Sequence, residues 1–151
     1  EGMQLLDWAE ERFRCSLGVT GISWGGAMVS AIGILAKRHD LAVTPCLPSA
    51  SAAVLVTGAL RREVAIARLA QERNVSEAEA EASLLAFLNA SDLEDARRLT
   101  EPFSAGARAV VQVSAAHDTF VPPEEGLQAF ATLRQVDPEA KLVWVPGGHV
   151  A

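Results

Sequence analysis

Strand-like and helix-like segments alternate from one end of this chain to the other. Apolar, β-prone runs lie at residues 14–20, 41–47, 107–114 and 141–145, and helix-like stretches separate them. Alternation of this kind predicts a parallel sheet with flanking helices packed on its faces. The length of 151 residues suits one domain, so we expect a single α/β domain over residues 1–151.

The helix-like stretches have apolar residues at helical spacing. We predict helices over residues 2–13, 27–38 and about 124–135. Residues 49–104 form an alanine-rich stretch that we interpret as a mostly helical insertion between two strands. Two capping boxes mark helix starts inside it, Ser76-x-x-Glu79 and Ser91-x-x-Glu94.

Charge and composition exclude several classes of function. The chain has 13 Lys and Arg against 19 Asp and Glu, a formal net charge of −6, and no basic cluster. We therefore expect no nucleic-acid partner and no docking on anionic lipid. Two cysteines, Cys15 and Cys46, are too few for a disulfide framework or a four-cysteine metal site, and we expect no metal and no cofactor.

Nothing in the chain resembles a targeting or membrane segment. No apolar run reaches the roughly 18 residues that a membrane span needs, and acidic residues interrupt the first helix. We take the cytoplasm as the default location. Because residue 1 is Glu and the first helix begins at once, we also expect the chain to be a fragment of a longer protein.

Residues 21–25, GISWG, match the pattern G-x-S-x-G. The pattern alone is weak, because glycine and serine are common residues. Its position is more informative, since it follows a predicted strand and precedes a predicted helix. That context is the one in which a nucleophile elbow holds a serine, here Ser23, above the sheet. The alternative is a glycine-rich start of a helix with no chemistry.

The elbow demands a tight backbone turn. The glycine-rich turn runs from Gly21 to Gly26, and we expect Gly21 and Gly25 to supply the room that the turn needs. A serine at the start of a helix also lies near unpaired backbone N–H groups, which can stabilise an oxyanion. The N–H of Trp24 is the first candidate donor.

Two further residues follow predicted strands. Asp118 comes after the strand at 107–114 and is a candidate to orient an imidazole; otherwise it only caps its loop. His149 comes after the last strand and is a candidate general base; otherwise it is a surface histidine. His117 is a rival base, but neighbours in an extended segment point opposite ways. Asp137 precedes a proline and is expected in a turn at the opposite edge of the sheet.

The order Ser23, Asp118, His149, each after its own strand, is the chain order of α/β-hydrolases. With these residues the chain resembles the C-terminal part of an α/β-hydrolase, a partial fold that holds about the last four strands of the sheet. In this resemblance Ser23 follows the fifth strand of the family, Asp118 the seventh and His149 the eighth. The insertion at 49–104 resembles the helical cap that follows the sixth strand.

A narrower resemblance concerns two segments. GVTGISWGGAM and TPCLPSASAAVLVTGAL resemble the alpha/beta-hydrolase domain containing protein 18 group, in which Met usually follows the serine. Here Trp24 stands in that place, which we expect to affect substrate choice more than mechanism. The resemblance implies further strands upstream and a second oxyanion donor on one of their loops. By itself this fragment is therefore expected to be a poor enzyme.

The function that these features predict is serine-dependent hydrolysis of a carboxylic ester through a Ser-His-Asp triad. The substrate would be a small-molecule or lipid ester. The lipase-like character is implied by the resemblance and by the apolar side chains of Leu84, Leu85, Phe87 and Leu88 in the insertion, which are more often simple helix packing. The sequence leaves the oligomeric state open.

Three alternatives remain at this point. The same triad also serves acyl transfer to an alcohol or thiol, and the scaffold could be a non-catalytic binding module. Thr20-Gly21-x-x-x-Gly25 also resembles the cofactor loop of short-chain dehydrogenases. The chain has no tyrosine, however, so the Tyr-x-x-x-Lys pair of that family is impossible.

Overall fold

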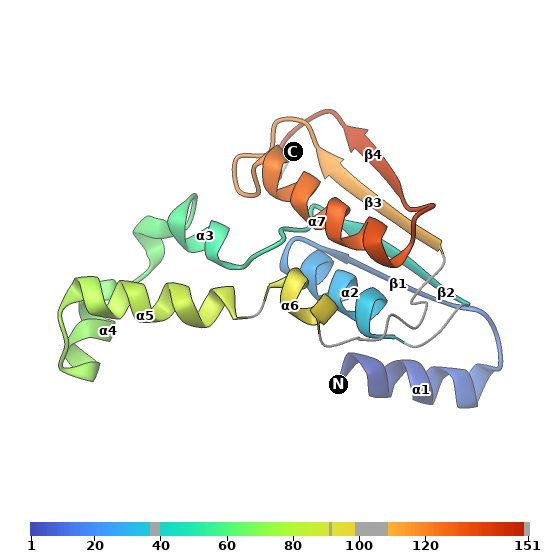
Figure 1. The fold of residues 1–151 in the computed structure, drawn as a ribbon, viewed down its shortest axis with the longest axis horizontal. Coiled ribbons are helices and arrows are strands. Elements are labelled where there is room, and N and C mark those ends of the chain that lie inside the picture. Colours follow the sequence, from blue (N-terminus) through green and yellow to red (C-terminus); the bar gives the residue numbers. More distant parts are fainter. Residues whose placement is uncertain (37–39, 91, 99–108, 150–151) are drawn as a thin grey trace.

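The four predicted strands form one parallel sheet in the computed structural model, which describes residues 1–36, 40–90, 92–98 and 109–149. The sheet order follows the chain order, β1-β2-β3-β4 (Figure 1). The strands are β1 (Leu17–Ile22), β2 (Leu41–Cys46), β3 (Ala109–Ala115) and β4 (Lys141–Val145). The predicted α/β class with a parallel sheet is confirmed.

One helix precedes the first strand, and the others fill the connections between the strands, as Figure 1 shows. The helices are α1 (Gly2–Phe13), α2 (Trp24–Leu35), α3 (Ala53–Thr57), the 3₁₀ helix η1 (Arg61–Glu63), α4 (Ile66–Arg73), α5 (Glu77–Asn89), α6 (Leu93–Arg98) and α7 (Pro123–Val136). The predicted helices at 2–13 and about 124–135 are confirmed within a residue of their bounds.

The described helices that pack on the sheet gather on one of its faces. Crossovers between parallel strands are right-handed, so strands added in one direction carry their helices on the same side. Accordingly α2, α6 and α7 contact one another. On β1, Val19 points toward these helices, whereas Gly18 and Thr20 are exposed. The predicted flanking helices are therefore present, and the uninterrupted strand order explains why those among the described residues share one face.

The hydrophobic core lies between the sheet and these helices. Val43 at the centre of β2 is fully buried, and Leu41, Val110 and Leu133 are nearly so. At Gly33 of α2, an added Cβ would lie 3.0 Å from a Val43 methyl, so the helix packs closely on the strand. Burial of these aliphatic side chains stabilises the layer by roughly 1.5–3 kcal/mol each.

Two element boundaries differ from the prediction. The first strand was predicted at 14–20 but begins at Leu17, because Arg14 ends α1 in a left-handed conformation (φ 49°) and its N–H donates to the Glu10 carbonyl. The second helix was predicted at 27–38 but begins at Trp24 and ends at Leu35. Its basic end at residues 37–39 lies outside the described residues.

The predicted insertion consists of two structurally different parts. α3, α4 and α5 extend away from the sheet, whereas α6 returns to it and places Leu93 in the core (Figure 1). The predicted capping box at Ser76 is confirmed, since the Ser76 side chain accepts from the Glu79 N–H at 3.2 Å. The box predicted at Ser91, and residues 99–104, lie outside the described residues.

The two connections of the insertion meet beside α7. The Leu93 N–H donates to the Ala50 carbonyl at 3.1 Å. The side chain of Glu125, in the first turn of α7, lies at this junction, which we call the neck of the insertion. Burial, followed by the negative charges of Asp92 and Glu124, raises the pKa of Glu125, while hydrogen bonds from the Ala50 and Ser51 backbones oppose the rise. A buried carboxyl oxygen of Glu125 and one of Asp92 have no hydrogen-bond partner among the described residues.

Candidate active site

The sheet topology brings the ends of β1, β3 and β4 to one edge. Ser23, Asp118 and His149 each follow one of these strands, and the structure brings the three side chains into contact. Oγ of Ser23 lies 2.8 Å from Nε2 of His149, and Nδ1 of His149 lies 2.7 Å from Oδ2 of Asp118. In α/β sheets this carboxyl edge is where ligand and catalytic groups gather.

Ser23 has the strained backbone expected of an elbow. Its φ is 57° and its ψ is −119°, a combination that a residue with a side chain adopts at a cost of about 1–3 kcal/mol. The surrounding hydrogen bonds hold it there. The Ser23 N–H donates to the Cys46 carbonyl at 2.9 Å, and the Ser23 carbonyl accepts from the Ala27 N–H at 3.0 Å. The strain is therefore imposed by the junction of β1, β2 and α2.

Two glycines make this junction possible, and one of them is not the glycine that we expected. An added Cβ at Gly21 would lie 2.4 Å from the Gly25 carbonyl oxygen, and one at Gly26 would lie 2.5 Å from the Cys46 carbonyl oxygen. A Cβ at Gly25 would meet no described atom within 4 Å. The steric reason given for Gly25 was therefore wrong, and the crowded positions are Gly21 and Gly26.

Trp24 is the first residue of α2, directly after Ser23. The N–H groups of the first helical turn have no acceptor within their own helix. They also lie at the positive end of the helix dipole. The Trp24 N–H therefore has no acceptor within α2, and the indole of Trp24 is half exposed.

The loop after β3 folds around the Asp118 carboxylate. Oδ1 of Asp118 accepts from the backbone N–H groups of Phe120 at 2.8 Å and Val121 at 2.9 Å. The carboxylate side chain is 2% exposed. Asp118 therefore caps its loop, as one interpretation of the sequence held, and contacts the imidazole as well.

The His149 loop is tied to the Asp118 loop through the backbone. The His117 N–H donates to the Gly147 carbonyl at 3.0 Å, and the Ala116 N–H donates to the Val145 carbonyl at 3.0 Å. Gly147 has φ +107°, which glycine adopts readily. These bonds bring His149 back over the end of β3, where its side chain is 11% exposed.

A neutral imidazole with its proton on Nδ1 satisfies both contacts of His149. Nδ1–H then donates to the Asp118 carboxylate, and Nε2 accepts from the Ser23 hydroxyl. In this state the serine proton already points at a base, and the base is held by a buried anion. Chemically, the His149 imidazole can take the hydroxyl proton of Ser23 while the Ser23 Oγ attacks an electrophile.

The other two candidates, His117 and Asp137, do not contact Ser23, Asp118 or His149 in the same way. His117 is exposed, whereas Asp118 beside it is buried, so the two side chains point in different directions. Asp137 is buried at the opposite edge, where it accepts from the N–H groups of Val110 at 3.2 Å and Glu139 at 3.0 Å. It joins the turn before β4 to the start of β3.

The sequence reasoning missed Phe120. Its ring stacks on the His149 imidazole, with the ring centroids 5.3 Å apart and an interplanar angle of 25°. The available signal was an aromatic residue two positions after the acid, in the loop that follows the predicted strand.

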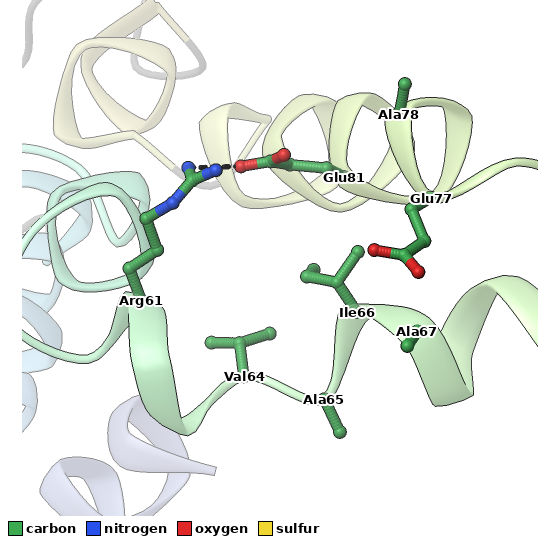
Figure 2. A pocket seen from close by; sticks show the side chains of 8 residues that line it. All are labelled: Arg61, Val64, Ala65, Ile66, Ala67, Glu77, Ala78 and Glu81. Carbon is green, nitrogen blue, oxygen red and sulfur yellow. Dashed lines mark hydrogen bonds and ion pairs between the residues drawn. The ribbon is translucent and has the colours of Figure 1, made fainter.

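One cavity lies in the insertion. It has a volume of about 480 Å³ and lies between residues 61–67 and α5, where an ion pair between Arg61 and Glu81 bridges the two segments (Figure 2). None of the three contacting residues Ser23, Asp118 and His149 lines it.

Cys15 and Cys46 are both free thiols. Among residues 1–36, 40–90, 92–98 and 109–149, no group of three or more His, Cys, Asp or Glu side chains could hold a metal ion. Within the same ranges, no helix is long and apolar enough to cross a membrane.

Comparison with known proteins gives a family and a fold. The family model described as Alpha/beta hydrolase domain containing 18 matches residues 1–81 and 66–151. No curated protein sequence matches the chain.

Two solved structures have a similar fold. An acylaminoacyl peptidase of Pyrococcus horikoshii aligns with a TM-score of 0.54 and 13% identity over 97% of this chain and 22% of its own. An esterase of Pyrococcus furiosus aligns with a TM-score of 0.52 and 16% identity over 96% of this chain and 50% of its own. At such identities the likeness is one of fold, and this chain spans half or less of the length of these proteins.

Proposed function

Because this chain belongs to the Alpha/beta hydrolase domain containing 18 family, we propose that it carries the nucleophile, base and acid of a serine hydrolase acting on carboxylic esters. Its architecture is part of an α/β-hydrolase fold. The observation that carries the proposal is the unbroken contact from Ser23 through His149 to Asp118, at 2.8 and 2.7 Å.

In the proposed reaction, Oγ of Ser23 attacks the ester carbonyl carbon while Nε2 of His149 takes the hydroxyl proton. Asp118 stabilises the imidazolium that forms. The proton then passes to the leaving alcohol, and an acyl-enzyme remains. A water molecule, deprotonated by the same imidazole, attacks the acyl carbon, and Ser23 regains its proton as the acid departs.

The negative charge that develops on the carbonyl oxygen needs hydrogen-bond donors. The proposal assigns the Trp24 N–H as one donor and a group outside this sequence as the second. Loss of one such donor typically costs about 10²–10³ in kcat. We therefore expect this sequence alone to react slowly and the complete protein to react well.

The ester would have an apolar acyl part. Ile22 and Trp24, which flank the nucleophile in the chain, are 66% and 48% exposed, so apolar surface is available beside Ser23. We propose that α3, α4 and α5 form a cap over a bound acyl chain, within the single domain. Phe87 of α5 is 71% exposed and could contact such a ligand.

The test is labelling of the full-length protein with a fluorophosphonate, followed by mass spectrometry to locate the adduct. Ser23→Ala removes the nucleophile, and Ser83→Ala removes an exposed serine of α5 as a matched control. The proposal expects an adduct on Ser23 in the wild type and in Ser83→Ala, and none in Ser23→Ala. An unchanged adduct in Ser23→Ala contradicts the mechanism, and a folded wild type that does not react favours a non-catalytic scaffold.

A further inference from the structure

Phe120 contacts two of the three proposed catalytic residues, His149 through its ring and Asp118 through its backbone N–H. Its ring stacks on the His149 imidazole, with ring centroids 5.3 Å apart and planes 25° from parallel. Its backbone N–H donates to Oδ1 of Asp118 at 2.8 Å. The same residue therefore fixes the carboxylate and covers one face of the imidazole.

The position of Phe120 is itself determined by its loop. The Val121 N–H donates to the same Asp118 oxygen at 2.9 Å, which closes a tight turn around residues 118–121. Pro122 follows and begins the first turn of α7, where its carbonyl accepts from the Glu125 N–H at 2.9 Å. The ring thus projects from a backbone that is held at both ends.

The hydrogen bond to Asp118 does not by itself fix the plane of the His149 imidazole. The ring can still tilt by small rotations about its Cβ–Cγ bond, and this motion would carry Nε2 away from Ser23. A flat aromatic ring stacked on the imidazole face opposes that rotation, and such pairs contribute beyond simple burial. An aromatic face within about 6 Å also attracts a cation, so the contact strengthens when His149 takes the serine proton.

We propose that Phe120 is a positioning residue, whose ring sets the plane of the His149 imidazole so that Nε2 faces Ser23. The inference rests on the proposed function, because it concerns how the proposed base is held. Phe120 reaches the reaction only through His149 and is not itself catalytic. Removal of the Phe120 ring should therefore lower kcat and leave KM unchanged.

The experiment compares three variants of Phe120 with the wild type in the full-length protein. Phe120→Leu and Phe120→Met remove the ring but keep an apolar side chain, and Phe120→Tyr keeps the ring. Phe13→Leu is the control, since Phe13 is exposed on α1 and its ring partner is Trp8. Two rates are measured: phosphonylation of Ser23 by a fluorophosphonate, and turnover of a short-chain p-nitrophenyl ester.

We expect Phe120→Leu and Phe120→Met to lower the phosphonylation rate and kcat by roughly 3- to 10-fold at unchanged KM. Phe120→Tyr and Phe13→Leu should match the wild type. Proton NMR supplies a second measurement, which does not depend on folding stability. The hydrogen-bonded Nδ1 proton of His149 should be sharp in the wild type and Phe120→Tyr, and broadened in the two variants without a ring.

The outcomes separate this inference from the proposed function. Absence of a Ser23 adduct in the wild type would overturn the function itself. Equal phosphonylation rates in the wild type, Phe120→Leu and Phe120→Met, with an unchanged Nδ1 proton, would overturn only the role of Phe120. A raised KM at unchanged kcat would also overturn it, because the ring would then contact substrate instead.

Discussion

Asp118 presents only one of its two carboxylate oxygens to His149. Oδ2 lies 2.7 Å from Nδ1 of the imidazole, whereas Oδ1 accepts from the N–H groups of Phe120 and Val121. The carboxylate thus has two separable tasks, one in orienting the base and one in closing its own loop. A substitution that changes one oxygen and spares the other can distinguish them.

Asp118→Asn should abolish reactivity without loosening the loop. The amide oxygen of Asn can still accept from Phe120 and Val121, but its NH₂ group then faces Nδ1 of His149. The imidazole must accept at Nδ1 and carry its proton on Nε2, so it can no longer accept the Ser23 proton. We expect the phosphonylation rate to fall on the order of 10⁴-fold, with a thermal unfolding midpoint close to that of the wild type.

Asp118→Ala is the comparison for that experiment. It removes both oxygens and leaves the Phe120 and Val121 N–H groups unpaired, one of them in a buried segment. Such a loss costs about 1–3 kcal/mol in the free energy of unfolding. If Asp118→Asn is as unstable as Asp118→Ala, the two tasks are not separable and the expected division is wrong.

Gly25 and Gly26 are neighbours in the first turn of α2, yet alanine should affect them in opposite ways. A Cβ at Gly26 would lie 2.5 Å from the Cys46 carbonyl oxygen, which is backbone and cannot move aside cheaply. We expect Gly26→Ala to lower the free energy of unfolding by about 1–3 kcal/mol. Gly25→Ala meets open space and should be neutral or stabilising by up to about 1 kcal/mol. Urea unfolding of both variants decides this, and equal destabilisation would contradict the described packing.

Much of this site could be predicted because it depends on chain order. Ser23, Asp118 and His149 follow the first, third and fourth predicted strands, and the carboxyl ends of parallel strands share an edge. Sequence spacing could not say which glycine is crowded, because that depends on how closely α2 approaches the Cys46 carbonyl. The sequence favoured His149 over His117 through strand order and the alternation of side chains, but the burial that separates the two is decided by the loops after β3 and β4.

Other parts of the fold were outside the reach of local patterns. The stacking of Phe120 on His149 joins residues from two loops, and no periodicity records such a contact. The placement of α6 on the core follows from Leu93 and Ala96, the two apolar residues of a mostly charged helix. β1 begins at Leu17, later than predicted, because Arg14 ends α1 in a left-handed conformation. Glycine or asparagine is the usual sequence signal for that conformation, and arginine is not.

Ser76→Ala should loosen α5 without affecting the proposed chemistry. The side chain of Ser76, followed by its backbone N–H, hydrogen-bonds Glu79 and lowers the pKa of that carboxyl from its ordinary value of 4.5. Loss of an N-cap costs about 1 kcal/mol, which should appear as faster amide hydrogen exchange in α5.

The pH dependence of this cap has a definite sign. Because the Glu79 pKa is lower in the folded protein, its contribution is present above pH 4.5 and is lost as the pH falls below that value. The exchange difference between the wild type and Ser76→Ala should therefore shrink in acid. Slower labelling of Ser23 in this variant would contradict the separation of the capping box from the site.

Glu125→Gln should make the protein more stable at neutral pH. Burial raises the pKa of Glu125, and the charges of Asp92 and Glu124 add to the rise. In the window above the ordinary value of 4.5 and below the raised pKa, the folded state binds more protons than the unfolded state. Stability therefore falls as the pH rises through that window, and the neutral amide escapes this loss.

Gln also suits the contacts at this neck of the insertion. Its oxygen can accept from the Ala50 and Ser51 N–H groups, and its neutral side chain removes the repulsion between Glu125 and Asp92. Thermal unfolding from pH 4 to 8 should show the two proteins converging in acid and Glu125→Gln melting higher at neutral pH. Glu139→Gln, at an exposed position, is the control and should track the wild type at every pH. A lower melting temperature of Glu125→Gln at neutral pH would mean that the Glu125 carboxylate holds the insertion in place, because its bonds to Ala50 and Ser51 would then outweigh the cost of burying its charge.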